Sequence, residues 1–299
     1  MSISEIARQT EALGVSCQEQ VPMSQRTSFR IGGPAELMLF PASPAELRSC
    51  LSLCRAAGEK PFILGNGSNL LVKDSGLDGV VVAMEGLRGI ELLEGCRIRC
   101  AAGEKLSELC LYAQKNGLAG LEFAYGIPGS AGGAVFMNAG AYGGEMKDVL
   151  LDVEYIDAQG EFSSLRASEL GLSYRHSAFM ENGGTVTALT VRLRPGDPGE
   201  IRTMMDDIMG RRREKQPLEF PSAGSVFKRP EGQFAGALIE QCGLKGRRVG
   251  DAQVSEKHAG FIVNRGEAMA RDVRALIALV QTVVEDETGV FLEPEIKFI

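Results

Sequence analysis

The sequence contains no apolar run that approaches the roughly 20 residues of a membrane-spanning helix. Residues 1–14 scatter charges among short apolar stretches, so the apolar core of a secretory signal is missing as well. No repeat with a period of about 20 to 50 residues occurs, which excludes solenoid and propeller architectures. We therefore expect a cytoplasmic protein without membrane insertion.

Basic residues do not dominate the chain. The sequence has 32 Lys and Arg against 39 Asp and Glu, for a net charge of -7. It lacks the general positive field that attracts a polyanion such as DNA. We expect no nucleic-acid partner, and local contacts must hold any anionic ligand.

Signals for metal binding and for disulfide bonds are also lacking. Only two histidines occur, and neither an H-E-x-x-H motif nor paired Cys/His spacing is present. The seven cysteines are an odd number, form no C-x-x-C pair and lie mostly in apolar stretches. This pattern predicts no metal site and reduced, buried thiols.

The composition is otherwise that of a globular protein with excess glycine. Hydrophobic residues make up 44% and charged residues 24% of the 299 positions, which excludes disorder, collagen and coiled coil. The length favours two domains, and the cluster of Pro, Gly and charge at 194–200 indicates a boundary. The 37 glycines exceed the usual share of about 7% and require an explanation.

The spacing of hydrophobic residues and the positions of capping residues, Gly and Pro predict alternating helices and strands. The clearest helix runs from Pro44 to a left-handed stop at Gly58, with Ser43 and Glu46 forming a capping box. The final helix has no good N-cap, because Met269 and Ala270 stand where Ser, Thr or Asp is expected. Further helices are predicted at 103–117, 201–216, 234–243 and 271–288. The segment 61–72 is predicted as a strand that enters a Gly/Asn/Ser loop, and further strands are predicted at 79–86, 150–160 and 183–195, the last two joined by a turn at 158–160.

The first glycine-rich loop, Gly65–Asn69, half-matches the dinucleotide fingerprint G-x-G-x-x-G. Leu70 stands where the third glycine belongs, and turn residues at 74–79 leave no room for a crossover helix, so a Rossmann fold is disfavoured. Backbone N–H groups of such a loop can still face a pyrophosphate, with Ser68 adding a donor. An ordinary tight turn remains the alternative.

A second glycine-rich segment, 126–144, has apolar residues threaded through it and therefore differs from a linker. Two such loops in one half of the chain suit a long ligand better than a mononucleotide. Dense glycine permits close backbone approach to a flat ring or a pyrophosphate. A structural crossing between subdomains is the alternative.

Several polar clusters have two interpretations each. Ser225 follows a glycine and resembles an exposed nucleophile, but the motif is not G-x-S-x-G, and a hydrolase triad would have only His176 or His258 as base. The basic run 211–215 fits a diphosphate and equally a solvated helix end. Glu293 and Glu295 share one face of an extended strand unless Pro294 bends it.

The order of these blocks closely resembles the UDP-N-acetylenolpyruvoylglucosamine reductase family, also called UDP-N-acetylmuramate dehydrogenase, over nearly the whole chain. The resemblance is carried by seven ordered blocks, namely TSFRIGGPA, LGNGSNLLV, GIPGSAGGAVFMNAGAYGGE, SYRHSAF, QPLEFPSAGSVFKRP, LIEQCGLKG with GDAQVSEKHAGFIVN, and LEPEIKFI. The short stretch between SYRHS and GSVFK is similar to the family's shorter type, which lacks an inserted tyrosine loop.

The resemblance implies an α/β (α+β) fold with a p-cresol methylhydroxylase-type FAD-binding domain and a C-terminal α/β substrate-binding domain. We expect an N-terminal helical segment at 1–25, an FAD-binding domain of two small α/β subdomains at 26–195 with an internal boundary near 85, and a substrate-binding domain at 196–299. The implied activity is NADPH-dependent, FAD-mediated reduction of the enolpyruvyl ether of UDP-N-acetylglucosamine enolpyruvate to UDP-N-acetylmuramate, a cytoplasmic step of peptidoglycan synthesis.

Family roles carry over to matching positions of this sequence. The implied catalytic residues are Arg175, Ser225 and Glu295. The implied cofactor-binding residues are Gly65, Asn66, Gly67, Ser68, Asn69, Ile127, Pro128, Gly129, Ser130, Gly133, Asn138, Gly140, Ala141 and Tyr142. The expected substrate-binding residues are Tyr174, Arg213, Lys215, Lys228, Arg229 and His258. FAD should be noncovalent, because neither glycine-rich loop contains a histidine or cysteine.

Two other functions fit parts of the pattern. One is a noncatalytic flavin or nucleotide-sugar binding module, against which the joint presence of Arg175, Ser225 and Glu295 argues. The other is an oxidase that uses O2, against which the blocks after residue 200 argue. Bleaching of flavin absorbance by NADPH without air would separate these functions from a reductase.

Overall fold

A computed structural model describes all residues 1–299 of the chain. The chain forms two compact units, each discontinuous in sequence. Unit 1 comprises residues 1–19, 37–66 and 79–211, and unit 2 comprises residues 20–36, 67–78 and 212–299. The domain limits at 25, 85 and 195 remain predictions.

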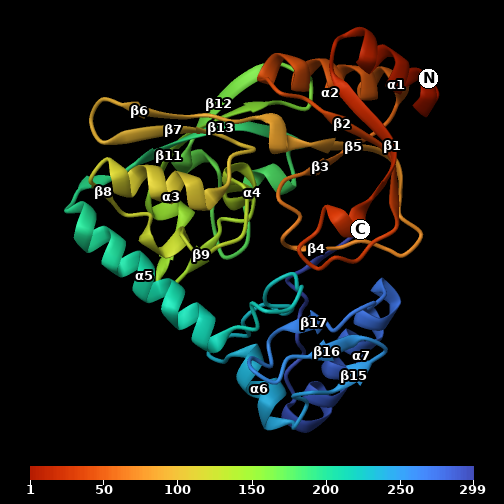
Figure 1. Ribbon diagram of the computed structural model, residues 1–299, viewed down its shortest axis with the longest axis vertical. Helices are drawn as coiled ribbons and strands as arrows, with labels where there is room; N and C mark the ends of the chain where they lie inside the picture. Colours follow the sequence, from red (N-terminus) through yellow and green to blue (C-terminus); the bar gives the residue numbers. More distant parts are fainter. The chain divides into compact units, whose positions relative to one another are not determined.

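A five-stranded antiparallel sheet organises unit 1 (Figure 1). Its strands, in spatial order, are β12 (Phe162–Arg166), β11 (Leu150–Ile156), β13 (Thr185–Arg192), β7 (Arg97–Ala101) and β6 (Ile90–Leu93). The predicted turn at 158–160 leads from β11 into β12 rather than into β13. Sequence patterning missed β12 because this edge strand, FSSLR, is mostly exposed and has no apolar alternation.

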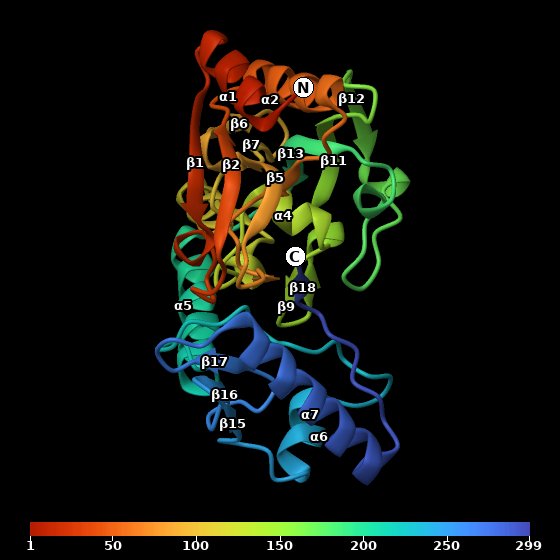
Figure 2. The same ribbon diagram turned by 90° about the vertical axis from the view of Figure 1, so that its right-hand side faces the viewer.

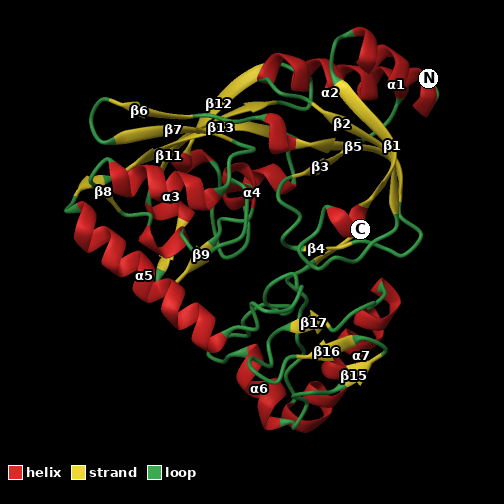
Figure 3. Ribbon diagram, viewed as in Figure 1, coloured by secondary structure: helices red, strands yellow, loops and turns green.

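Helices cover the sheets of unit 1 (Figures 1 and 3). They are α1 (Ile3–Ala12), α2 (Pro44–Ala57), α3 (Leu106–Lys115) and the short α4 (Ala131–Phe136), which packs on β13. Helix α2 confirms its predicted ends, because Ser43 Oγ accepts the N–H of Glu46 at 3.2 Å and Gly58 is left-handed with φ +75°. The sequence did not predict α4 within the glycine-rich segment.

A second sheet has the order β1 (Ser16–Pro22), β2 (Pro34–Phe40), β5 (Leu77–Ala83) and β3 (Phe62–Leu64). Strands β3 and β5 are parallel, and the chain between them contains only the two-residue strand β4 (Leu70–Leu71). No crossover helix follows the first glycine-rich loop, so the structure agrees with the expectation that disfavours a Rossmann fold.

Unit 2 has a small antiparallel sheet with helices (Figure 2). The strands are β15 (Arg248–Val249), β16 (Ala252–Val254) and β17 (Ile262–Asn264), and the helices are α6 (Ala235–Gln241) and α7 (Ala270–Thr288). Helix α7 buries the apolar face that its spacing predicts, including Val273, Leu276 and Val280. Helix α5 (Pro198–Lys215) contains the boundary between the two units, because residues up to 211 are assigned to unit 1 and residues from 212 to unit 2. It ends before Pro217, as predicted.

The missing N-cap of α7 is supplied from a distant part of unit 2. The Asp74 carboxylate accepts the backbone N–H groups of Ala270 at 2.6 Å and of Arg271 at 3.1 Å. The negative charge of Asp74 also interacts favourably with the positive end of the helix dipole at the N-terminus of α7. Asp74 lies in a segment that the sequence marks only as a turn, so local patterning could not reveal the cap.

The remaining elements are short. They are the strands β8 (Leu118–Ala119), β9 (Gly140–Ala141), β10 (Gly144–Glu145), β14 (Arg194–Pro195) and β18 (Lys297–Phe298), and 3-10 turns at Met23–Gln25, Met84–Gly86, Glu122–Ala124, Met146–Asp148, Ala167–Glu169 and Ala178–Met180.

All seven cysteines are free thiols, and four of them are buried. Burial raises the pKa of Cys50 to about 12 and that of Cys54 to about 11, which keeps both thiols protonated at neutral pH. None of the helices has the length and apolar character needed to cross a bilayer.

Candidate active site

The two predicted glycine-rich loops contact each other within unit 1. Asn66 Nδ2 donates to the carbonyl of Pro128 at 2.9 Å, and a Cβ on Gly65 would lie only 2.6 Å from Ser130 Oγ. Ser130 Oγ also accepts the N–H of Gly133 at 3.2 Å and so caps α4. With Ser130 Oγ in its capping position, glycine at position 65 avoids this clash, and the two loops form one cradle of small residues.

Tyr142 occupies the tip of a two-residue hairpin that joins β9 to β10. Tyr142 has φ +52° and Gly143 has φ +87°, the signs required by a type I′ turn. This conformation favours Asn or Gly, so a tyrosine there is strained. The Tyr142 side chain is 44% exposed and therefore available for contact.

Arg175 occupies the tip of a second tight hairpin of unit 1. Ser173 and His176 exchange backbone hydrogen bonds of 3.3 and 3.2 Å, which leaves Tyr174 and Arg175 as the turn. Arg175 has φ +56°, and its guanidinium lies 5.0 Å from the centre of the Tyr174 ring. A left-handed conformation costs a non-glycine residue about 1–2 kcal/mol, and such strain often marks functional positions.

Ser225 of unit 2 is held by its neighbours on a fixed strand-like segment. Gly224, with φ +79°, turns the chain, and Ser225 is exposed while Val226 and Phe227 are buried. The N–H of Val226 donates to the carbonyl of Gly260 at 2.9 Å. Burial of the two following residues thus fixes the backbone and leaves the serine hydroxyl accessible.

Glu295 is bonded to the same segment of unit 2. Its backbone N–H donates to the carbonyl of Val226 at 2.7 Å, and its carbonyl accepts Asn69 Nδ2 at 3.3 Å. The N–H of Lys297 returns a bond of 2.9 Å to the Asn69 carbonyl, and β18 continues parallel to β4. The segments that carry Asn69, Ser225 and Glu295 are therefore joined within unit 2 by backbone bonds and by the Asn69 side chain.

Cations surround this part of unit 2. The Lys228 side chain forms an ion pair with Glu293 through Nζ. The backbone N–H of Lys228 donates to the Glu293 carbonyl at 2.8 Å. The Arg229 guanidinium lies 4.6 Å from the centre of the Phe234 ring. Glu293 is exposed and Glu295 is half-buried, so the two carboxylates lie in different environments.

His258 is a mostly buried imidazole of unit 2. Nδ1 accepts the N–H of Gly260 at 3.1 Å, and the ring packs edge-on against Phe261 with centroids 5.0 Å apart. Burial lowers the pKa of His258, so the ring is neutral at pH 7 and carries its proton on Nε2. Nδ1 is therefore engaged within the protein, and Nε2–H is the remaining donor of the ring.

The basic cluster at the end of α5 has a contact that the sequence did not indicate. Lys257 Nζ donates to the carbonyl of Arg213 at 2.6 Å and lies 3.7 Å from Glu219 Oε2. Lys257 and Arg265 line a polar cavity of about 230 Å³ in unit 2. Arg213 and Lys215 are exposed, which fits both a ligand contact and a solvated helix end.

The predicted residues divide between the two units. Unit 1 holds Gly65, Asn66, Ile127, Pro128, Gly129, Ser130, Gly133, Asn138, Gly140, Ala141, Tyr142, Tyr174 and Arg175; unit 2 holds Gly67, Ser68, Asn69, Arg213, Lys215, Ser225, Lys228, Arg229, His258 and Glu295.

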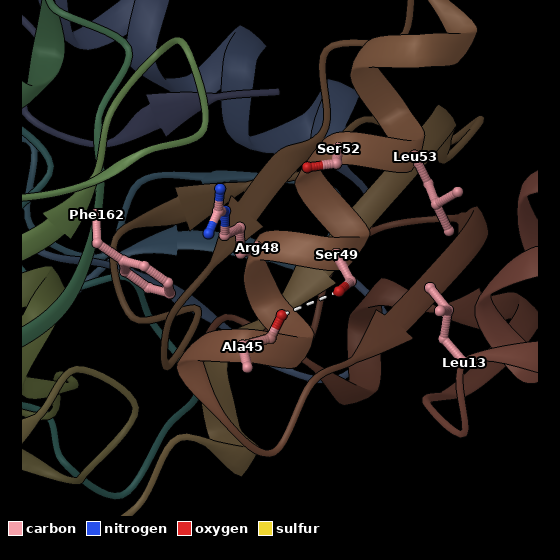
Figure 4. A pocket seen from close by; sticks show the side chains of 7 residues that line it. All are labelled: Leu13, Ala45, Arg48, Ser49, Ser52, Leu53 and Phe162. Carbon is pink, nitrogen blue, oxygen red and sulfur yellow. Dashed lines mark hydrogen bonds between the residues drawn. The ribbon is translucent and has the colours of Figure 1, made fainter.

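The larger cavity, of about 470 Å³, lies outside these clusters (Figure 4). It is an open depression along α2, where the Arg48 guanidinium lies 5.4 Å from the centre of the Phe162 ring. Its lining includes none of the predicted site residues. The structure contains no group of three or more His, Cys, Asp or Glu placed to hold a metal ion.

Comparisons with known proteins decide the family. Residues 216–299 match the C-terminal domain of UDP-N-acetylenolpyruvoylglucosamine reductase, and residues 35–166 match an FAD-binding domain. A UDP-N-acetylenolpyruvoylglucosamine reductase of Clostridium novyi is 47% identical over 282 residues, which cover 94% of this chain and 92% of that protein. The chain belongs to the UDP-N-acetylenolpyruvoylglucosamine reductase family.

Other members of the reductase family agree over nearly the full length. The protein of that name from Agathobacter rectalis is 48% identical over 309 residues, covering 99% of this chain and 98% of the relative. The crystal structure of UDP-N-acetylenolpyruvylglucosamine reductase from Thermus caldophilus matches with a TM-score of 0.80 and 38% identity, covering 95% of this chain and 98% of that one. These matches confirm an FAD-dependent oxidoreductase of peptidoglycan precursor synthesis.

The flavin fold extends beyond the reductase family. BBE-like 1 of Physcomitrella patens matches with a TM-score of 0.50 at 18% identity, covering 65% of this chain and 45% of that one. At this identity the match shows the fold alone. It supports the predicted mixed α/β architecture with a p-cresol methylhydroxylase-type FAD-binding domain.

The strained hairpin tip generates a stability prediction. We expect Arg175→Gly to be more stable than Arg175→Ala by about 1 kcal/mol, because glycine adopts positive φ without steric cost. At an unstrained position the order would be reversed, because glycine has the larger entropy in the unfolded chain. Urea unfolding of the two variants measures the difference, and a higher midpoint for Arg175→Ala would contradict the strain.

Proposed function

We propose that this chain reduces the enolpyruvyl ether of UDP-N-acetylglucosamine enolpyruvate to the lactyl ether of UDP-N-acetylmuramate, with NADPH as hydride donor and noncovalently bound FAD. The observation that carries the proposal is the strained Arg175 hairpin, which is tied to the glycine-rich segment by a 3.0 Å bond from Asn138 Nδ2 to the Ser173 carbonyl. The joint presence of Arg175, Ser225 and Glu295 argues against a noncatalytic binding module, which would not need the serine.

The residues of the cradle fit a flavin. Gly65 lets the first loop approach Ser130 closely, and the exposed Gly133 presents a surface without a side chain on α4. In this proposal Gly65, Asn66 and the segment 127–130 hold the cofactor through backbone N–H groups, while Tyr142 contacts it from the hairpin tip. When bound, FAD supplies hydride transfer between NADPH and the enolpyruvyl group.

Arg175 serves as the electrostatic stabiliser. Addition of hydride to the terminal alkene carbon leaves carbanion charge on the neighbouring carbon, and this charge delocalises into the substrate carboxylate as an enediolate. A guanidinium placed beforehand stabilises the developing charge without reorganising during the step. Its position on a two-residue turn restricts the backbone from which the side chain extends.

Ser225 serves as the proton donor to carbon. Its exposed hydroxyl lies on a backbone that Gly260 and Glu295 hold by hydrogen bonds. Because the intrinsic pKa of a serine hydroxyl is high, the donor requires help, and Lys228 and Glu295 remain the two candidate relays. Glu295 can bond the substrate carboxylate only if it is protonated or paired with a cation.

Substrate binding is assigned to Tyr174, Arg213, Lys215, Lys228, Arg229 and His258. His258, as a neutral Nε2–H donor, is suited to an uncharged or anionic acceptor. We also propose that the chain is of the shorter family type. The chain from 178 to 223 consists mainly of β13, β14 and α5, which supports this assignment because it leaves little length for an inserted tyrosine loop.

The two half-reactions make different demands on Ser225. Reduction of FAD by NADPH needs no proton delivered to carbon, whereas reduction of the enolpyruvyl group does. We expect Ser225→Ala to bleach anaerobically with NADPH within a few fold of wild type. Its reoxidation by the UDP-sugar should be slowed about 100- to 10,000-fold, the usual effect of a lost general acid.

Stopped-flow absorbance of the flavin measures both steps on one sample. Equal slowing of both half-reactions would make Ser225 structural or flavin-binding. Unchanged rates in both would show that the proton comes from another group.

Lys215 tests the diphosphate assignment. We expect Lys215→Ala to weaken binding of the UDP-sugar by about 1.5 to 3 kcal/mol, the value of a charge-assisted contact. Arg211→Ala is the matched control, because Arg211 is paired with Asp207 at 2.7 Å on the same helix. Titration calorimetry should show weaker UDP-sugar binding for Lys215→Ala and unchanged binding for Arg211→Ala. Equal affinities in both variants would mean that Lys215 belongs to a solvated helix end and does not contact the diphosphate.

A further inference from the structure

Asn138 is a buried amide whose polar atoms are all engaged by the protein itself. It is 1% exposed and has φ +39°, a left-handed conformation that asparagine tolerates. Nδ2 donates to Glu145 Oε2 at 2.8 Å and to the Ser173 carbonyl at 3.0 Å, and Oδ1 accepts the N–H of Lys147 at 3.0 Å. The Asn138 side chain therefore connects neighbouring segments of the protein through hydrogen bonds.

The bonds of Asn138 connect the glycine-rich segment to the hairpin that carries Arg175. The Ser173 carbonyl, which Asn138 holds, belongs to the residue that closes this hairpin. Ser177, fully buried, donates through Oγ to the Phe136 carbonyl at 2.7 Å on the other side of the hairpin. Two side-chain bonds to positions 136 and 138 therefore fix both ends of the turn.

Glu145, a hydrogen-bond partner of Asn138, also interacts electrostatically with Arg175. The pKa of Glu145 lies below its usual value, chiefly because of its bond to Lys147, with further lowering by the Asn138 amide and by the positive charge of Arg175. Glu145 lies on β10, the second strand of the Tyr142 hairpin. Asn138 thus connects the two hairpins whose tips are strained.

We propose that Asn138 is a positioning residue for Arg175, acting through the Ser173 carbonyl rather than by contact with the cofactor. This inference rests on the proposed role of Arg175. Loss of the bond to Ser173 frees one end of a turn whose tip is held in an unfavourable conformation. The guanidinium then loses its fixed placement, which transition-state stabilisation requires.

Asn138→Gly is the first variant because glycine accepts φ +39° and removes only the amide. Its non-catalytic readout is limited trypsin digestion of the native protein at the Arg175–His176 bond. We expect cleavage there at least about 10-fold faster than in wild type, since proteolysis follows local opening. Asn182→Gly, which alters an exposed asparagine bonded to the N–H of Gly184, is the control and should cleave at the wild-type rate.

A second variant separates the Ser173 bond from general packing. In Asn138→Asp combined with Glu145→Gln, the amide and the carboxylate exchange places, so the bond between positions 138 and 145 can form in reverse. The bond from Lys147 can also be kept, but no donor remains for the Ser173 carbonyl. We expect this double variant to regain stability over Asn138→Asp alone while Arg175–His176 cleavage stays fast.

Kinetics test whether the effect passes through Arg175. We expect Asn138→Gly to slow flavin reoxidation by the UDP-sugar about 10- to 100-fold, with flavin reduction by NADPH unchanged. In an Arg175→Ala background the same change should slow reoxidation less than about 3-fold, because residues acting as a unit are not additive.

Three outcomes would overturn the proposal: wild-type cleavage at Arg175–His176 in Asn138→Gly, full recovery in the exchanged double variant, or equal slowing of reoxidation in both backgrounds. A wild-type reoxidation rate in Arg175→Ala would refute the proposed role of Arg175 instead. Fast cleavage in Asn138→Gly would then still establish that Asn138 holds the hairpin.

Discussion

The absence of a side chain at Gly65 is the constraint on which the proposed flavin site depends. A Cβ there would lie 2.6 Å from Ser130 Oγ, closer than packed atoms tolerate. The contact lets the loop after β3 meet the segment before α4, where Asn66 bonds Pro128 and Ser130 caps the helix. In the proposed site, two segments whose bonded residues lie 62 positions apart thereby present backbone rather than side chains to the ligand, which accounts for part of the excess glycine.

Strain at two positions of the proposed site is accompanied by buried polar bonds. Arg175 and Tyr142 both have left-handed backbones at hairpin tips, each costing about 1–2 kcal/mol. Asn138 and Ser177, both buried, bond the segments that carry these tips. In unit 2 the Val226 carbonyl accepts the backbone N–H of Glu295, and the Asn69 side chain donates to the Glu295 carbonyl. Hydrogen bonds between neighbouring segments thus hold the backbone at the proposed site residues Tyr142, Arg175 and Glu295.

Sequence patterns predicted the elements whose signals are local. Helix α2 has its cap and its glycine stop within sixteen residues of sequence, and α7 shows its buried stripe directly. The glycine-rich loops were recognised, but not that Gly65 contacts Ser130. Strand β12 was missed because an exposed edge strand has no apolar period. Asp74 as the cap of α7, and Asn138 as the link to Ser173, depend on contacts between distant segments that no local pattern contains.

The flavin content of position-65 variants tests the cradle most directly. Gly65→Ala should lose most of its FAD, measured as the ratio of flavin to protein absorbance after gel filtration. Adding Ser130→Ala removes the one atom within 3 Å of the new Cβ and should restore a large part of that FAD, with Ser130→Ala alone as the control. Full FAD in Gly65→Ala, or no gain in the double variant, would contradict the account that the close approach of the two loops builds the cofactor site.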